Sequence, residues 1–332
     1  MAPDSRGHPG KGGAPKVSVL ITSRNHEAYV TDAVASVLNQ TFRDFELILI
    51  DDGSTDDSPD VIRRFMDQQH PDVPFRLLLR ERRGRMPTLN EGLRLSTGTY
   101  FAPLVSDDTW APDRLERQVP VLDEAGPGVS SCYADCWVID EEGVTRDRLG
   151  AWEPFRGGDI YRDLVTLRYF PPAQTGLFRR SVMLEVGGFN ERLVFVDDWD
   201  LWLKVARCHR VLYLPEPLGS YRIHGGNATK GAVDEFFADA RTTFDDLIAR
   251  DPDLPVSTRR VRANLDAWHA GHLYNLLMFP EARRAALVAL RRIPSQRKAW
   301  TVLLRSMLGT RVVRWVRDRR REARFRGLRA AG

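Results

Sequence analysis

The chain has 332 residues, of which 42% are hydrophobic and 28% are charged. This length suits one large α/β domain with an appendage, and no apolar run approaches the roughly 18–20 residues that cross a bilayer, so we expect a soluble or peripheral protein. The net charge of +4 is uneven: nine arginines and two acids between Arg311 and Arg329 give +7 and leave −3 elsewhere, which argues against a nucleic-acid partner.

Residues 1–15 contain Gly, Pro, Lys and Arg but no apolar core of the kind that a signal peptide needs. We expect them to form a disordered leader, and we expect a cytoplasmic protein. The three cysteines, Cys132, Cys136 and Cys208, form neither an even disulfide framework nor a paired zinc-ligand pattern. A reducing compartment fits them, and we interpret them as structural.

The first hundred residues after this leader alternate between strand and helix patterns. Apolar runs predict four buried strands, over Val17–Thr22, Phe45–Asp51, Phe75–Arg80 and Tyr100–Val105. Apolar residues at helical spacing lie between them, with one helix beginning at Ser58-Pro59 and another over Leu89–Leu95. This alternation predicts an α/β fold with a parallel sheet and right-handed crossovers.

Two of these strands lead into adjacent carboxylates. The second ends at Asp51 and Asp52, and the fourth is followed by Asp107 and Asp108. The carboxyl ends of parallel strands are where α/β sheets bind ligands. Negative charge clustered there is costly unless a cation or a hydrogen-bonding ligand compensates it, so the sequence predicts a metal-dependent nucleotide site.

Beyond Asp108 the alternation is interrupted. Pro112–Leu122 predicts a helix, and Val129–Asp140 predicts a strand followed by a hairpin. Ala151–Pro172 is rich in Gly, Pro and aromatic residues, and we expect a loop with a short helix that covers the site and sets specificity.

The last hundred residues show helical patterns separated by prolines and no strand signals. We place a domain boundary near Gly226. The expected organisation is a catalytic domain over residues 16–226 and a helical C-terminal region with a basic tail over residues 227–332.

Six strings resemble the family 2 glycosyltransferases in their order and spacing. They are Val17–Thr22, Ser36–Thr41, Asp51–Ser54, Ser106–Asp108, Gly187–Phe189 and Asp197–Trp202. The resemblance spans roughly Pro15 to Thr229 and implies a GT-A fold, a Rossmann-like, mostly parallel sheet with helices on both faces. Such enzymes bind a nucleotide-diphosphate sugar across the strand ends and transfer the sugar with inversion to a hydroxyl acceptor.

The resemblance puts four residues at the donor nucleotide. Thr22 matches the strand end beside the base, and Asp52 matches the carboxylate that hydrogen-bonds the base, with Asp51 as its neighbour. A carboxylate suits the imide of uracil or guanine, so we favour UDP, with GDP or dTDP as alternatives. Arg24 stands where the family often has a stacking aromatic residue, and arginine can itself stack on a π-face. Alone, the string after Ile50 also fits a strand-ending turn with Asx hydrogen bonds.

The resemblance assigns Asp107 to the donor ribose and Asp108 to a Mn²⁺ or Mg²⁺ ion that bridges both phosphates. Oxygen ligands suit these ions, and the ion neutralises the charge that the leaving diphosphate gains. Many family members carry a further acid where Val105 and Ser106 stand here. In isolation, the acidic pair could equally cap the following helix.

Asp198 matches the family's catalytic base, which accepts the proton of the acceptor hydroxyl. A carboxylate is ionised at neutral pH and serves in this role when its geometry is tight. Asp197 and Asp200 are the second choices for the base. All three acids also fit a plain helix N-terminus, where carboxylates favour the helix dipole.

The segment from Tyr221 to Asn227 resembles the family's motif after its last strand. By this resemblance Arg222 faces the diphosphate and His224 completes the metal site; the alternative for His224 is a solvated loop histidine. Arg85 lies in a segment that crosses the nucleotide in relatives, where it would pair with phosphate or base, and surface placement is its alternative.

The main functional hypothesis is therefore a metal-dependent inverting glycosyltransferase, and the alternative is a non-catalytic nucleotide-sugar-binding or membrane-associated partner module with the same fold. A dinucleotide enzyme would carry a glycine-rich loop after the first strand, and Thr22–His26 contains no glycine. A processive synthase would carry transmembrane helices and a Gln-x-x-Arg-Trp motif, which Gln296–Trp300 does not match.

The basic tail places Val312, Trp315 and Val316 on one helical side and arginines elsewhere. This pattern predicts peripheral contact with an anionic membrane through Arg311–Arg329, at the inner face of the membrane. A solvated basic helix has the same pattern.

Overall fold

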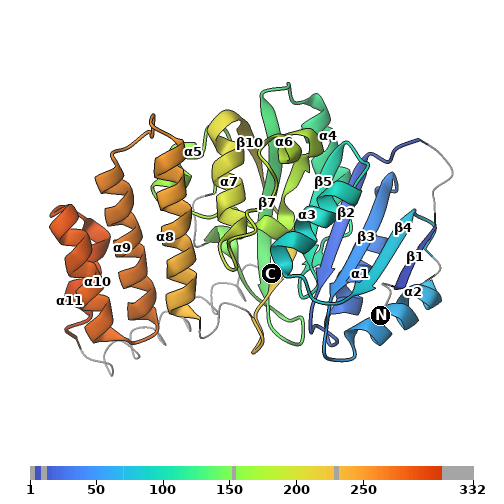
Figure 1. The fold of residues 1–332 in the computed structure, drawn as a ribbon, viewed down its shortest axis with the longest axis horizontal. Helices are drawn as coiled ribbons and strands as arrows, with labels where there is room; N and C mark the ends of the chain where they lie inside the picture. The colour runs from blue at the N-terminus through green and yellow to red at the C-terminus, as the bar shows by residue number, and fades with distance from the viewer. Residues whose placement is uncertain (1–3, 9–12, 70, 152–154, 228–231, 309–332) are drawn as a thin grey trace, which may run out of the picture. The chain divides into compact units, whose positions relative to one another are not determined.

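The computed structural model describes residues 4–8, 13–69, 71–151, 155–227 and 232–308 (Figure 1). The chain divides into two compact units, Met1–Tyr161 with Tyr169–Asn227 and Arg162–Arg168 with Ala228–Gly332. The first unit holds the sheet, and the described part of the second is helical. Among the described residues, no helix is both long and apolar enough to cross a bilayer.

The sheet of the first unit has ten strands in the order β1-β4-β3-β2-β5-β9-β7-β10-β6, with β8 paired to β7. The strands are β1 (Asp4–His8), β2 (Val17–Ser23), β3 (Phe45–Asp52), β4 (Phe75–Arg80), β5 (Tyr100–Val105), β6 (Thr109–Trp110), β7 (Val129–Ile139), β8 (Thr145–Arg148), β9 (Leu177–Arg179) and β10 (Arg210–Arg222).

The four strands predicted in the first half form a parallel block at one side of the sheet. β2 pairs in parallel with β3 and β5, and β3 pairs in parallel with β4. Each lies within one residue of its predicted bounds. β2, β3 and β5 are buried almost throughout, which is the pattern of a parallel strand covered on both faces. The mixed α/β architecture is confirmed.

Helices cover both faces of this block. The helices of the first unit are α1 (Val30–Leu38), α2 (Ser58–Gln69), α3 (Arg85–Leu95), α4 (Arg114–Glu124), α6 (Arg180–Glu185) and α7 (Asp197–Cys208). Val19 and Ile21 join the buried cluster of α1. Leu20, which points the other way, lies against α3, where a Cβ on Gly92 would clash with its side chain. Glycine at this position lets α3 approach the sheet.

The segment that we expected to carry a loop and a short helix contains the short helix α5 (Tyr161–Val165). The 3₁₀ turns η1 (Leu149–Ala151) and η2 (Ala173–Thr175) lie at its two ends. The predicted strand and hairpin are also present, because β8 pairs antiparallel with β7. On β7, Cys132 and Cys136 are buried free thiols, and burial raises the pKa of Cys132 to about 12. Cys208 is exposed.

Strand β1 lies inside residues 1–15, which the sequence predicts to be disordered. It pairs antiparallel with β4, so the prediction is wrong for Asp4–His8. Without β1, β4 would be an edge strand with unpaired backbone groups, and backbone pairing requires no apolar pattern in the added strand.

The second unit packs helices through small side chains. Its long helices are α8 (Val233–Arg250), α9 (Thr258–Asn275), α10 (Phe279–Arg292) and α11 (Arg297–Arg305). Buried alanines, among them Ala270, Ala282 and Ala286, fill the core of α9, α10 and α11, so that these helices approach closely. The predicted helical C-terminal region is confirmed for the described residues, and Arg311–Arg329 lies outside them.

Candidate active site

The carboxyl ends of six strands lie at one edge of the sheet. β9 is antiparallel to both β5 and β7, so β7 runs in the direction of β5, and β10 is parallel to β7. The segments that follow β2, β3, β5 and β10 therefore meet at the edge where α/β sheets bind ligands. These four segments carry most of the residues that the sequence singles out.

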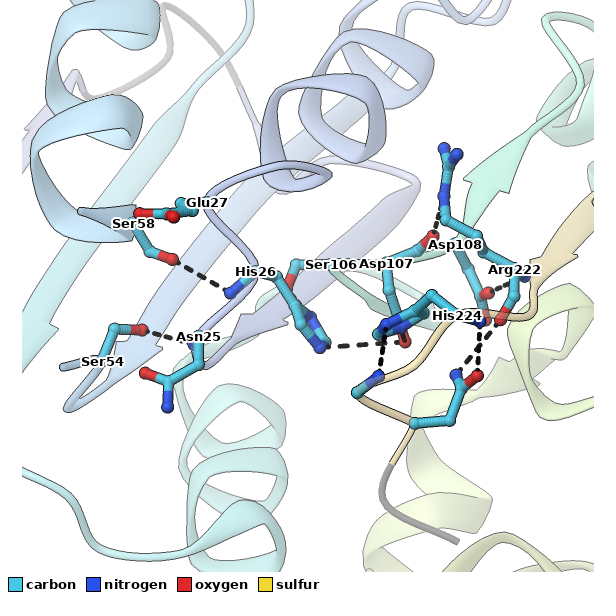
Figure 2. A network of polar contacts seen from close by, with 12 residues as sticks. Asn25, His26, Glu27, Ser54, Ser58, Ser106, Asp107, Asp108, Arg222 and His224 are labelled. Atoms are coloured by element: carbon cyan, nitrogen blue, oxygen red, sulfur yellow. Dashed lines mark hydrogen bonds and ion pairs between the residues drawn. The ribbon is translucent and has the colours of Figure 1, made fainter. Parts of the chain in front are cut away.

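Two imidazoles and one carboxylate gather at this edge, where His26, Asp107 and His224 point toward one another (Figure 2). They come from the loops after β2, β5 and β10, and one ligand atom of each lies within 4.8 Å of the others. Asp107 Oδ2 is 3.1 Å from His224 Nε2 and 3.8 Å from His26 Nε2. Within the described part of the chain, this is a group of side chains that could together hold a metal ion.

Contacts with neighbouring loops hold His26 in place. Its backbone N–H donates to Ser58 Oγ at 3.0 Å, and its ring Nδ1 lies 2.8 Å from Ser106 Oγ. Asn25, in a left-handed conformation with φ 54°, donates its N–H to Ser54 Oγ. Burial, together with His224, lowers the pKa of His26 against the opposing effect of Asp107, which favours a neutral imidazole.

His224 is fixed by its own turn. Its N–H donates to Asn227 Oδ1 at 2.7 Å, and its Nδ1 accepts the N–H of Gly226 at 3.2 Å. Because Nδ1 is an acceptor, the proton of a neutral ring sits on Nε2 and is donated to Asp107. His224 and Asp107 thus form a hydrogen-bonded pair in this structure.

Asp108 is not part of this group. Its Oδ1 accepts the backbone N–H of Arg222 at 2.9 Å, and burial together with Asp107 raises its pKa well above the usual range. The Arg222 side chain is also buried: Nε donates to the Asp107 carbonyl at 2.9 Å, and Nη2 lies 3.0 Å from Asp32 Oδ2. The structure therefore brings His224 together with Asp107 rather than with Asp108, and Arg222 braces the acidic loop.

The Asp52 carboxylate bonds other groups of its own chain. Its two carboxylate oxygens accept the N–H groups of Arg83 and Gly84, both at 2.8 Å, and Arg80 Nη2 lies 3.4 Å from Oδ1. These bonds fix the turn that begins α3, in which Gly84 has a φ of 105°. A carboxylate has about four lone-pair sites, so further bonds to Asp52 remain geometrically open.

The other expected nucleotide residues differ in exposure. Thr22 is buried at the end of β2, whereas Arg24 is exposed. Asp51 accepts both the N–H and the hydroxyl of Ser54, at 2.9 and 2.6 Å, and burial raises its pKa despite these bonds. The Asx turn considered as the alternative for this string is therefore present.

A second acidic pair begins helix α7. Asp197 is buried and accepts a hydrogen bond from Arg85 Nη1 at 2.9 Å, so that Arg85 pairs with a carboxylate of its own chain. Asp198 is partly exposed, and its Oδ1 accepts the N–H of Trp199. Desolvation, followed by Asp197, raises the pKa of Asp198 to about 6, and Arg85 opposes the shift. Asp200 is buried and pairs with Lys204 Nζ at 2.9 Å.

His26 and Ser106 are the members of the site that sequence reasoning missed. A signal was present, because His26 lies in the loop after the first predicted strand, at the same sheet edge as the acids. In this loop we assigned a role to Arg24 but none to His26. A metal-ligating residue type in such a loop is itself an indication of a site.

The chain is similar to known proteins in both sequence and fold. The model of the family described as "Glycosyl transferase family 2" matches residues 18–187. An uncharacterized glycosyltransferase of Nostoc sp. strain PCC 7120 is 31% identical over 223 residues, which cover 64% of this chain and 66% of that protein. The chain thus spans just under two thirds of the length of this relative.

Two solved structures resemble the chain over most of its length. A structure of S. aureus TarS 1–349 in complex with UDP-GlcNAc has a TM-score of 0.60 at 16% identity, covering 88% of this chain and 89% of that one. The mannosyltransferase PcManGT from Pyrobaculum calidifontis, in complex with GDP-Man and Mn²⁺, has a TM-score of 0.57 at 22% identity, covering 91% and 82%. These likenesses show the GT-A fold.

Proposed function

The chain belongs to glycosyltransferase family 2, and we propose that it is an inverting, metal-assisted enzyme that moves a sugar from a nucleotide-diphosphate sugar to a hydroxyl acceptor. One observation carries the proposal: Arg85 pairs with Asp197, and against the effect of burial its pKa is raised by Asp197 and by three further carboxylates, those of Asp198, Asp107 and Asp108. The acidic pair suited to a base and the metal-capable group therefore belong to one electrostatic site.

The donor nucleotide would lie across the ends of β2 and β3, beside Thr22, Asp51 and Asp52. The Asp52 oxygens have lone pairs left after binding Arg83 and Gly84, and these would accept the imide N–H of a uracil or guanine base. We keep UDP as the favoured donor nucleotide. Arg24 is exposed at this edge and suits stacking on the base.

Asp107 and His224 are the residues that would hold a Mn²⁺ or Mg²⁺ ion. The donor set fits, because a carboxylate oxygen and an imidazole nitrogen lie within bonding distance of a common point. When bound, such an ion neutralises the negative charge that the leaving nucleotide diphosphate gains. Asp108, the ligand expected from the sequence, binds the Arg222 N–H and is better suited to shaping the loop.

Asp198 is the proposed base. With a pKa of about 6 it is mostly ionised at neutral pH, yet basic enough to accept a proton as the acceptor oxygen attacks. Attack on the anomeric carbon opposite the nucleotide inverts that carbon in a single displacement. Arg85, through Asp197, positions the start of α7 that carries the base.

Peripheral membrane contact is a second part of the proposal. Between Ala282 and Leu308 the chain has six arginines, one lysine and no acid. Exposed apolar side chains lie in the same stretch: Leu287, Val288, Trp300, Leu304, Met307 and Leu308. Basic and apolar groups without acids favour the surface of an anionic membrane, where a cytoplasmic enzyme would meet a lipid-linked glycan acceptor. Sedimentation of the full chain with vesicles of anionic and of neutral lipid tests this contact.

Calorimetric titration with UDP, GDP, dTDP and CDP, each with Mn²⁺ and again with chelator, tests the donor site. We expect one nucleotide to bind tightly and only with metal. Metal-dependent binding without any sugar transfer from a donor panel would favour the alternative, a non-catalytic nucleotide-sugar-binding module.

A further inference from the structure

The metal-capable group contains a second imidazole that the proposed function does not use. His26 Nε2 faces Asp107 Oδ2 at 3.8 Å, a separation too long for a hydrogen bond. The ring is nevertheless held firmly, by Ser106 Oγ at Nδ1 and by Ser58 Oγ at the backbone. A ring nitrogen that is fixed beside a carboxylate without bonding to it is suited to a shared cation.

The contacts of His26 are those of a metal-ligating histidine. Such a histidine donates its other ring N–H to an oxygen, which fixes both the tautomer and the orientation of the ring. If Nδ1–H donates to Ser106 Oγ, the lone pair of Nε2 is directed at the group that contains Asp107 and His224. His224 differs, because its Nε2 carries the proton and must move it to Nδ1, giving up the Gly226 contact, before it can ligate.

We propose that His26 is a direct ligand of the donor-site ion, so that two imidazoles and one carboxylate select a first-row transition ion such as Mn²⁺ or Co²⁺ over Mg²⁺. This inference rests on the metal-assisted function proposed above. Mg²⁺ favours all-oxygen surroundings, whereas the affinity of a site that contains nitrogen rises along the first transition row from Mn²⁺ through Co²⁺. With one anionic ligand, a divalent ion keeps a net charge of +1, which attracts a diphosphate.

Pulsed electron paramagnetic resonance of Mn²⁺ bound to the full chain with UDP or GDP counts the coordinated nitrogens. We expect two imidazole nitrogens in the wild type and one in His26→Gln, with at least a roughly tenfold loss of Mn²⁺ affinity. The matched control is His209→Gln, because His209 belongs to the same unit and lies by Glu185 outside the group. Thermal melting checks that the variants are folded.

A second variant tests selectivity. His26→Glu replaces the nitrogen by an oxygen ligand, so the preference for Mn²⁺ over Mg²⁺, measured as the ratio of their dissociation constants, should fall about tenfold or more. If the nitrogen count and the preference are the same in His26→Gln and in the wild type, the assignment of His26 is wrong while the metal site stands. If neither nucleotide promotes Mn²⁺ binding to the wild type, the metal-assisted function fails together with this inference.

Discussion

Arg85 Nη1 donates a hydrogen bond to Asp197 Oδ1 at 2.9 Å and so ties the first residue of α3 to the first residue of α7. The two residues are 112 positions apart in the sequence. Asp197 in turn raises the pKa of Asp198, while Arg85 lowers it. The position and the basicity of the proposed base therefore both depend on this ion pair.

Removing Arg85 should weaken turnover and shift its pH dependence. Without the guanidinium, the pKa of Asp198 should rise above its present value of about 6, because the two main causes, burial and Asp197, would act unopposed by it. In Arg85→Ala the acid limb of the pH–rate profile should move to higher pH. The control is Arg83→Ala, since the Arg83 side chain is mostly exposed and pairs with Glu91. An unmoved profile in Arg85→Ala would show that the pair has no part in setting the base.

The activity of the wild type should fall as the pH decreases through about 6. Protonation of Asp198, whose pKa lies there, removes the proton acceptor. Initial rates of transfer at pH values from roughly 5 to 8 check this, with nucleotide binding measured over the same range. A rate that stays constant to the acid end of this range with binding intact would rule out Asp198 as the base.

Asp198→Asn should make the protein more stable at neutral pH. The folded-state pKa of about 6 lies above the ordinary value of 3.8, so the contribution of this group to stability is present below pH 3.8 and is lost as the pH rises through about 6. The neutral amide of the variant avoids burying a charge. We therefore expect the free energy of unfolding to increase by about 1–3 kcal/mol near neutral pH, and this increase should vanish near the ordinary pKa of the carboxyl. Urea unfolding at both pH values measures it. Asp200→Asn is the contrast, because loss of the buried Lys204 pair should lower stability.

Asp107→Asn should abolish the metal dependence of nucleotide binding, whereas Asp108→Asn should preserve much of it. The asparagine in the second variant keeps an amide oxygen that can accept the Arg222 N–H, and Asp108 does not belong to the group that contains the two imidazoles. Calorimetry with Mn²⁺ and with chelator distinguishes the variants. The reverse result would restore Asp108 as the metal ligand that the resemblance implies.

Asp52→Ala should cost stability as well as base preference. It removes the acceptor of the Arg83 and Gly84 N–H groups, and each of these partly buried hydrogen bonds contributes about 1 kcal/mol. Asp52→Asn retains one acceptor oxygen and should lose less. Unfolding curves and a titration with the four nucleoside diphosphates separate the two effects. Wild-type stability in Asp52→Ala would contradict the role of Asp52 in the turn.

The parallel block could be predicted from sequence because each buried strand is a local apolar run. Strand β10 could not be predicted, because Pro215 and Pro217 interrupt its apolar pattern and its register with β7 shifts there. The start of α3 at Arg85 rather than Leu89 depends on Asp52, a contact between distant residues that no local pattern records.

The candidate site was also predicted only in part. The acidic residues at the strand ends could be located from the sequence, because they recur in ordered motifs. The sequence could not show which carboxylate of the Asp107–Asp108 pair lies with the imidazoles, because the Asp108 carboxylate binds the backbone N–H of the distant Arg222. His26 was missed because its function depends on Ser106 and Asp107, which are about 80 residues away in the chain.

The most direct test of the central claim is release of nucleotide diphosphate from a panel of UDP- and GDP-sugars, measured with Mn²⁺ for the wild type and for Asp198→Asn. We predict that the wild type turns over at least one donor, and that the variant binds the same nucleotide with similar affinity while its rate falls about 10²–10⁴-fold. Equal rates in the two proteins, with equal binding, would contradict the account of Asp198 as the base of a glycosyltransferase.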